Sequence, residues 1–243
     1  MTARKLPVII TRAEPGASET AGRLAAFGID PILAPMLSLE PDLECAIPDL
    51  STRSGLVFTS ANGVRVFADR DPNRSLTAWC VGPATAKAAR EAGFEQVRES
   101  AGNAVDLAHF IAEHVEGSER PLLHIANADA KGDLKTQLEA LGHALDFAPR
   151  YAMRPAPALP HSAQQALQSA DNTVVMIHSA KGATRLADLC AGLSLTKLVV
   201  VAISEPASQP LSNLPLTALH VASAPNEDSL MSALSAAIAT LSA

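Results

Sequence analysis

The chain has 243 residues, of which 48% are hydrophobic and only 3% aromatic, and its formal net charge is −6. This length allows one large domain or two small ones, each with a packed core. The negative charge argues against nucleic acid or an acidic membrane surface as a partner. Many aliphatic and few aromatic residues are typical of parallel sheets that helices cover on both faces.

Apolar runs and cysteines indicate where the protein works. The apolar stretch near the N-terminus is too short for the core of a signal peptide. The longest strongly apolar run, residues 198–203, is far too short to cross a membrane. The cysteines Cys45, Cys80 and Cys190 are scattered, which fits neither a disulfide framework nor a metal-binding pair. We therefore expect a cytoplasmic protein with reduced thiols and no membrane association.

Short runs of β-forming residues alternate with amphipathic helical segments along the chain. Several helical segments end in glycine, at Gly28, Gly93 and Gly142, as is common just after a helix. Regular alternation of strand, turn and helix predicts an α/β fold with parallel sheets. The expected strands are residues 7–11, 31–35, 56–59, 78–81, 121–125, 145–149, 174–178, 198–203 and 218–222. The expected helices include residues 19–27, 84–92, 105–114, 133–141 and 229–241.

The two parts of the chain resemble each other. Residues 56–69 read LVFTSANGVRVFAD, and residues 175–188 read VMIHSAKGATRLAD. The three matching pairs keep the same order at offsets of about 114 to 122 residues, which indicates an internal duplication and two similar lobes. The other two pairs are residues 24–28 with 138–142 and, more weakly, 81–85 with 203–207.

The duplication leaves two ways to divide the chain. The first is a single cut in mid-sequence, near Gly117. The second lets the chain cross between lobes twice, through residues 36–41 and 150–157, which are extended and rich in proline. We adopt the second because it explains both stretches. It predicts lobe one as residues 1–37 plus 156–243 and lobe two as residues 40–150. The crossings would form a two-stranded interlobe linker, with a ligand site in the cleft between the lobes.

Three strand-to-helix turns suit an anionic ligand. Ser60 and Ser179 each follow an expected strand and open a helix, and Gly82 stands in a third such turn. Unpaired amides and the helix dipole at these N-termini attract carboxylates or phosphates. The plainer interpretation of each serine is an ordinary N-cap. In these turns and the matching turn of the other repeat, the candidate binding residues are Thr59, Ser60, Ala61, Asn62, Gly82, Thr85, Ser179, Lys181 and Ser204.

Several familiar site signatures are missing from the sequence. It has no GxGxxG after the first strand, no GxxxxGK[ST] phosphate loop and no GxSxG nucleophile turn. His109 and His114 are five residues apart, which is the wrong spacing for one helix face. His124 and His178 fall in expected strands and are interpreted as packing or hydrogen-bonding residues. We predict no metal site.

Arg12 and Tyr151 stand at informative places. Arg12 ends the first strand, at the sheet edge where open α/β folds bind ligands. The alternative for Arg12 is a surface ion pair. Tyr151 is the only tyrosine and stands at the start of the second linker. It either braces the hinge as an amphipathic wedge or donates a proton or hydrogen bond to a leaving group.

Together these motifs resemble the uroporphyrinogen-III synthase family. The resemblance runs nearly end to end and rests on the order of three motifs: residues 10–12 (ITR), 57–64 (VFTSANGV) and 81–86 (VGPATA). It implies two α/β lobes joined by a two-stranded ladder, and an enzyme that needs neither cofactor nor metal. It also implies a monomer that receives its substrate in a transient hand-over from hydroxymethylbilane synthase.

The resemblance implies the chemistry as well. Hydroxymethylbilane, a linear tetrapyrrole with many carboxylates, would be closed to uroporphyrinogen III with loss of water and inversion of ring D. This is a lyase reaction of tetrapyrrole and heme biosynthesis. Tyr151 matches a family tyrosine that assists loss of the hydroxyl. The resulting azafulvene cation is attacked by the substituted carbon of the terminal ring, and the spiro intermediate fragments and recloses.

Some positions differ from the family pattern. Ser204 and Ala207 stand where glycine and threonine are common, and Asn127 and Lys131 stand near places where glycine and arginine are frequent. Asn127 and Lys131 are kept as candidate binding residues. A second class of protein also fits the sequence: a non-catalytic, two-lobed cytoplasmic binding protein or sensor for a small anionic ligand.

Overall fold

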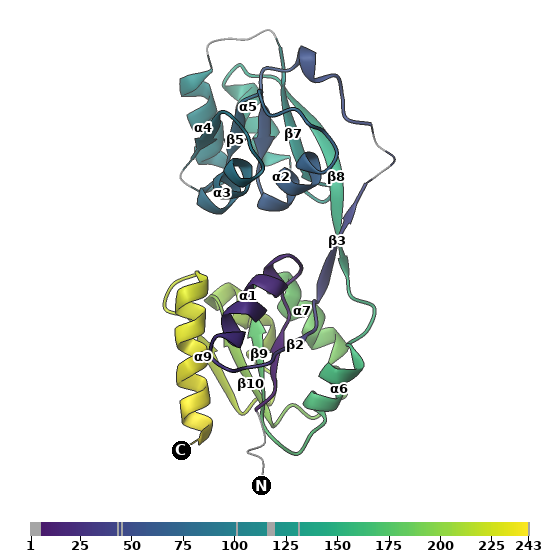
Figure 1. Cartoon of the computed structure of the whole chain (residues 1–243), viewed down its shortest axis with the longest axis vertical. Helices are drawn as coiled ribbons and strands as arrows, with labels where there is room; N and C mark the ends of the chain where they lie inside the picture. Colours follow the sequence, from purple (N-terminus) through teal and green to yellow (C-terminus); the bar gives the residue numbers. More distant parts are fainter. Residues whose placement is uncertain are drawn as a thin grey trace. The chain divides into compact units, whose positions relative to one another are not determined.

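The computed structural model of the chain (Figure 1) describes residues 6–42, 44, 46–100, 102–115, 120–130 and 132–242. The chain divides into two compact units, each with its own sheet. Unit 1 comprises Met1–Leu39 and Arg154–Ala243, and unit 2 comprises Glu40–Met153. Within the described ranges, no helix is both long and apolar enough to cross a membrane.

Unit 1 is built on a parallel sheet of strand order β11-β10-β9-β1-β2. Its strands come from both ends of the chain, so that β1 pairs directly with β9. The strands are β1 (Val8–Ile10), β2 (Ile32–Leu33), β9 (Thr173–Ile177), β10 (Leu198–Ala202) and β11 (Ala218–Val221). The helices are α1 (Gly16–Ala25), α6 (His161–Leu167), α7 (Ala180–Leu189), α8 (Glu205–Ser208), the 3-10 turn η2 (Gln209–Leu211) and α9 (Glu227–Ser242).

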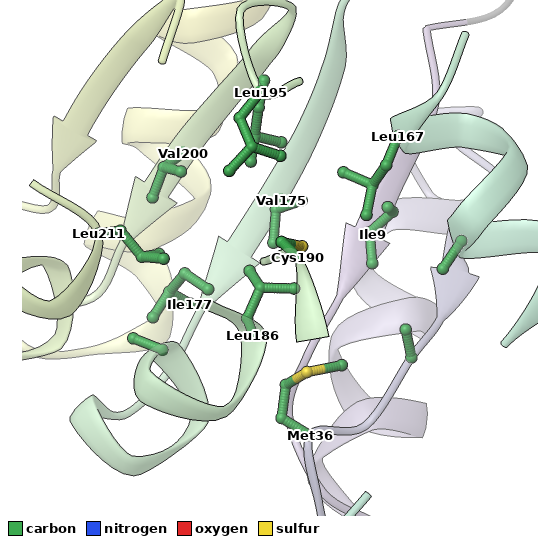
Figure 2. Close-up of a cluster of buried hydrophobic side chains, with 14 of the residues drawn as sticks. Ile9, Met36, Leu167, Val175, Ile177, Leu186, Cys190, Leu195, Val200 and Leu211 are labelled. Atoms are coloured by element: carbon green, nitrogen blue, oxygen red, sulfur yellow. The ribbon is translucent and has the colours of Figure 1, made fainter. Parts of the chain in front are cut away.

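Alternate residues of these strands pack against two helical layers. Ile9 and Val175 face α6 and α7, whereas Val8 and Val174 face α1 and α9. Figure 1 shows α6 and α9 on opposite sides of the sheet. Figure 2 shows the first layer, in which Cys190 lies next to Val175. Strands buried on both faces need apolar residues at every position, which explains their continuous aliphatic runs.

Unit 2 is built on a second sheet, of strand order β3-β8-β7-β4-β5-β6. Helices α2 and α3 pack on one face of this sheet, and α4 and α5 pack on the other. The strands are β3 (Leu37–Pro41), β4 (Leu56–Phe58), β5 (Ala78–Cys80), β6 (Val97–Glu99), β7 (Leu122–Asn127) and β8 (Leu145–Pro155). The helices are the 3-10 turn η1 (Leu50–Thr52), α2 (Ala61–Ala68), α3 (Pro83–Glu91), α4 (Ala104–His114) and α5 (Asp133–Ala140).

Strands β3 and β8 lie side by side in this sheet. Backbone hydrogen bonds join Ala156 N to Met36 O at 2.9 Å and Asp42 N to Arg150 O at 2.8 Å. The partner numbers fall in one strand as they rise in the other, so the pairing is antiparallel. Strand β8 runs on to Pro155, well beyond the expected end at residue 149, because β3 supplies partners for its second half.

The α/β fold with helix-flanked parallel sheets, predicted from the sequence, is confirmed. Gly28, Gly93 and Gly142 follow helices with φ of +72°, +89° and +85°, the left-handed region that favours glycine. Strand β6 was not predicted, because its three residues are mostly polar and partly exposed at a sheet edge. Cys80 and Cys190 are buried free thiols, and Cys45 lies outside the described residues.

Candidate functional site

Four strands of unit 2 bring candidate residues to one edge of the sheet. Thr59 and Ser60 directly follow β4, Gly82 follows β5, Asn127 ends β7 and Tyr151 lies in β8. Strands β4, β5, β7 and β8 are parallel, so the carboxyl ends of β4, β5 and β7 meet at one edge, and Tyr151 of β8 lies there opposite Asn127. This is the edge at which open α/β sheets bind ligands.

Tyr151 lies against the start of helix α2. Its phenol interacts with the side chain of Ser60, and only 4% of the residue is exposed. Burial raises the pKa of the Tyr151 phenol, and the interaction with Ser60 partly opposes this increase. The phenol is therefore neutral at neutral pH and keeps its proton next to the positive end of the α2 dipole.

Thr59 is held by His124, on the neighbouring strand. Thr59 Oγ1 lies 2.9 Å from His124 Nε2, and the ring of Phe147 packs edge-on against the imidazole. Burial lowers the pKa of His124 to about 4, so the imidazole is neutral at neutral pH. From the sequence, His124 is interpreted only as a packing or hydrogen-bonding residue. The pairing of β4 with β7 reveals its contact with Thr59, because His124 lies opposite Val57, and Val57 is on the same face of the sheet as Thr59.

Ser60 and Ser179 both act as N-caps. Ser60 Oγ accepts a hydrogen bond from Asn62 N at 3.2 Å, and Ser179 Oγ accepts one from Gly182 N at 3.1 Å. Both serines therefore make the capping bond that the plainer interpretation predicts. Ala61, the first residue of α2, keeps its amide at the open end of the helix.

Gly63 is required for α2 to lie this close to the sheet. A Cβ atom at this position would approach Ile125 O, a backbone atom of β7, to 2.7 Å. The helix that carries Ser60 is therefore held against the strand next to Tyr151 by the absence of a side chain.

The other candidates of unit 2 have mixed surroundings. Gly82 is the N-cap of α3, and Thr85 in its first turn is buried, with 5% exposed. Asn127 Oδ1 accepts a hydrogen bond from Asp129 N, and the next residue, Ala128, donates its N–H to Tyr151 O. Asn127 thus shapes the turn beside Tyr151. Lys131 lies outside the described residues.

The candidates of unit 1 lie at the carboxyl edge of its own sheet. Arg12 follows β1, and its Nη1 lies 3.5 Å from Glu227 Oε2 and 3.9 Å from Glu19 Oε2, so the ion-pair alternative describes its contacts here. Ser179 and Lys181 are exposed at the start of α7. Ser204 precedes the four-residue α8 and makes no capping bond with its side chain. The candidates thus form two groups, one in each unit.

A family model of uroporphyrinogen-III synthase (HemD) matches residues 18–232. The chain belongs to the uroporphyrinogen-III synthase family. This confirms the resemblance seen in the sequence motifs and places the chain among the enzymes of heme biosynthesis. The family does not favour the alternative of a non-catalytic binding protein.

Solved structures of this family share the fold. The uroporphyrinogen-III synthetase of Helicobacter pylori 26695 is 15% identical, with 96% of this chain and 100% of that chain covered and a TM-score of 0.66. A mutant uroporphyrinogen III synthase of the extremely thermophilic bacterium Thermus thermophilus is also 15% identical, with coverages of 98% and 99% and a TM-score of 0.54. No curated protein matches the sequence significantly.

Proposed function

We propose that this uroporphyrinogen-III synthase is a cyclising lyase in which Tyr151 is the acid that releases water from hydroxymethylbilane. The observation that carries the proposal is the neutral phenol of Tyr151, bonded to Ser60 at the N-terminus of α2, in a chain that matches the family over most of its length. A buried phenol with a raised pKa still carries the proton that a departing hydroxyl needs.

The first step breaks the bond between carbon and the terminal hydroxyl. Tyr151 gives its proton to that oxygen, which leaves as water, and the pyrrole chain becomes an azafulvene cation. The tyrosinate that remains is stabilised by the dipole of α2 and by the hydrogen bond with Ser60. The substituted carbon of ring D then attacks the cation to form the spiro intermediate. This fragments and recloses with ring D inverted, and the ring proton released at the end restores the phenol.

The rest of the site holds the substrate in the conformation that inverts ring D. Free hydroxymethylbilane closes spontaneously without inversion, so the enzyme must mainly choose the conformation and the ring carbon that reacts. Amide-rich turns can hold carboxylates without a basic protein. The proposed contacts are Thr59, Ser60, Ala61, Asn62, Gly82, Thr85, Asn127 and Lys131 in unit 2 and Arg12, Ser179, Lys181 and Ser204 in unit 1.

No step of this reaction requires a cofactor or metal. We further propose that the enzyme works as a monomer in the cytoplasm and takes its substrate directly from hydroxymethylbilane synthase. The instability of the free substrate supports such a hand-over, because any delay would allow closure without inversion.

The decisive experiment supplies freshly made hydroxymethylbilane and separates the product isomers. We expect uroporphyrinogen III to form faster than the spontaneous reaction makes the type I isomer. Only type I product, at the uncatalysed rate, would contradict the synthase proposal and support an anion-binding protein instead.

A further inference from the structure

The carboxylate of Glu227 gathers three side chains of unit 1. Thr20 Oγ1 donates a hydrogen bond to Glu227 Oε1 at 2.7 Å. Arg12 Nη1 and His178 Nε2 both lie 3.5 Å from Glu227 Oε2. Glu227 is the first residue of α9, so one carboxylate joins the ends of β1 and β9 to the start of α9 and to Thr20 in the middle of α1.

Glu227 is ionised although it is largely buried. Burial raises its pKa, but the contacts with His178 and Thr20 and the charge of Arg12 outweigh burial and hold the pKa at about 2. The His178 side chain is 7% exposed, and neither ring nitrogen makes a hydrogen bond of good geometry. Glu227 Oε2, 3.5 Å from His178 Nε2, is therefore the carboxylate that faces this ring.

The internal repeat gives His178 a counterpart in unit 2. His178 immediately precedes Ser179, the N-cap of α7, just as Thr59 immediately precedes Ser60, the N-cap of α2. In unit 2 the side chain of Thr59 is held by His124 from a neighbouring strand. Both units therefore anchor the residue before the capping serine, by different chemistry. Such an anchor limits the backbone angles that set the direction of the serine and of the helix amides.

We propose that Glu227 is a positioning residue for substrate binding, which acts through His178 to set the turn of Ser179. Glu227 does not itself touch the substrate, because one carboxylate repels another. The inference rests on the proposed function, in which the Ser179 turn holds a carboxylate of hydroxymethylbilane.

The test is the variant Glu227→Gln, measured with freshly made hydroxymethylbilane. The amide oxygen can still accept from Thr20, but the negative charge that pairs with Arg12 and faces His178 is lost. We expect KM to rise about tenfold, as for a misplaced binding group, while kcat changes by less than about twofold. The matched control is Asp228→Asn in the same turn, since Asp228 pairs with the exposed Arg23. It should leave KM unchanged.

A second variant, His178→Asn, tests the same chain of contacts and serves if Glu227→Gln fails to fold. Its KM should rise similarly, and the double variant should be no worse than either single one, because both changes break one connection. A lower melting temperature with unchanged KM would overturn the proposal and leave Glu227 a structural tie. A lower KM would overturn it too, since Glu227 would then compete with the substrate for Arg12.

The wild-type enzyme, run alongside, separates the two hypotheses. If it yields only type I product, the proposed function fails. If it yields type III product and Glu227→Gln keeps the wild-type KM, the positioning role alone is wrong.

Discussion

The phenol of Tyr151 interacts with the side chain of Ser60, the residue that caps helix α2. One serine thus serves two groups, the first amides of a helix and the only phenol of the protein. A phenol in this place is protonated at neutral pH and lies beside a helix N-terminus, which is what the proposed acid role of Tyr151 requires.

Tyr151→Phe should slow turnover far more than it weakens binding. The ring keeps its packing but loses the proton, and general acids contribute about 10²- to 10⁴-fold to rate. We expect kcat to fall by about 10²-fold or more with KM nearly unchanged, measured with freshly made hydroxymethylbilane. Wild-type turnover in this variant would show that Tyr151 only braces the chain.

Ser60→Ala should both destabilise unit 2 and raise the pKa of Tyr151. Loss of the cap costs about 1 kcal/mol, which urea denaturation would measure. The hydrogen bond with Ser60 lowers the phenol pKa, so its loss should move the tyrosinate absorbance titration to higher pH. Ser179→Ala is the control, because it removes an equivalent cap in unit 1. Equal shifts of the tyrosine titration in both variants would contradict the pairing.

Acid should destabilise unit 1 through Glu227. The pKa of this group is 4.5 in the unfolded chain and about 2 in the fold, so its contribution is complete above about pH 4.5. Below that pH the unfolded state binds the proton first, and stability falls until the folded carboxyl is also protonated. The loss is on the order of 3.5 kcal/mol, since the two pKa values differ by about 2.5 and one pKa unit corresponds to about 1.4 kcal/mol.

Unfolding in denaturant between about pH 5 and pH 2.5 measures this contribution. Above pH 4.5, Glu227→Gln should have a lower free energy of unfolding than the wild type. This difference should shrink toward the acid end of the range. The free energy of unfolding of Asp228→Asn should change with pH as that of the wild type does. A constant difference between Glu227→Gln and wild type at every pH would show that the charge of Glu227 has no part in the fold.

Gly63→Ala should destabilise the protein because of the contact with the backbone of β7. The new Cβ would meet Ile125 O at 2.7 Å, and moving the helix away should cost about 1–3 kcal/mol. Gly22→Ala is the matched control. Gly22 lies within α1, where an added Cβ meets nothing within 4 Å, and alanine should stabilise that helix by about 0.5–1 kcal/mol. If denaturation shows that both variants are more stable than the wild type, or that both are less stable, the close approach at Gly63 is contradicted.

Much of the architecture follows from local patterns in the sequence. The aliphatic run at residues 198–203 becomes β10, buried on both faces, and Gly28 takes the left-handed angle that ends a helix. Such features depend on neighbours along the chain, so spacing and residue type reveal them. The start of β8 was predicted correctly, but its C-terminal end was missed because it depends on pairing with β3, a segment far away in the sequence.

The contacts of the candidate site could not be predicted in the same way. The order of motifs by itself pointed to the family and singled out Tyr151 and Ser60 as candidates, but nothing in the spacing joins them to each other. Thr59 and His124 are 65 positions apart, and Arg12 and Glu227 are 215 apart. Such pairs form only when strand order and register bring distant segments to one sheet edge. A periodic pattern records which face a residue takes but not which strand lies beside it, and that was decided by the tertiary structure.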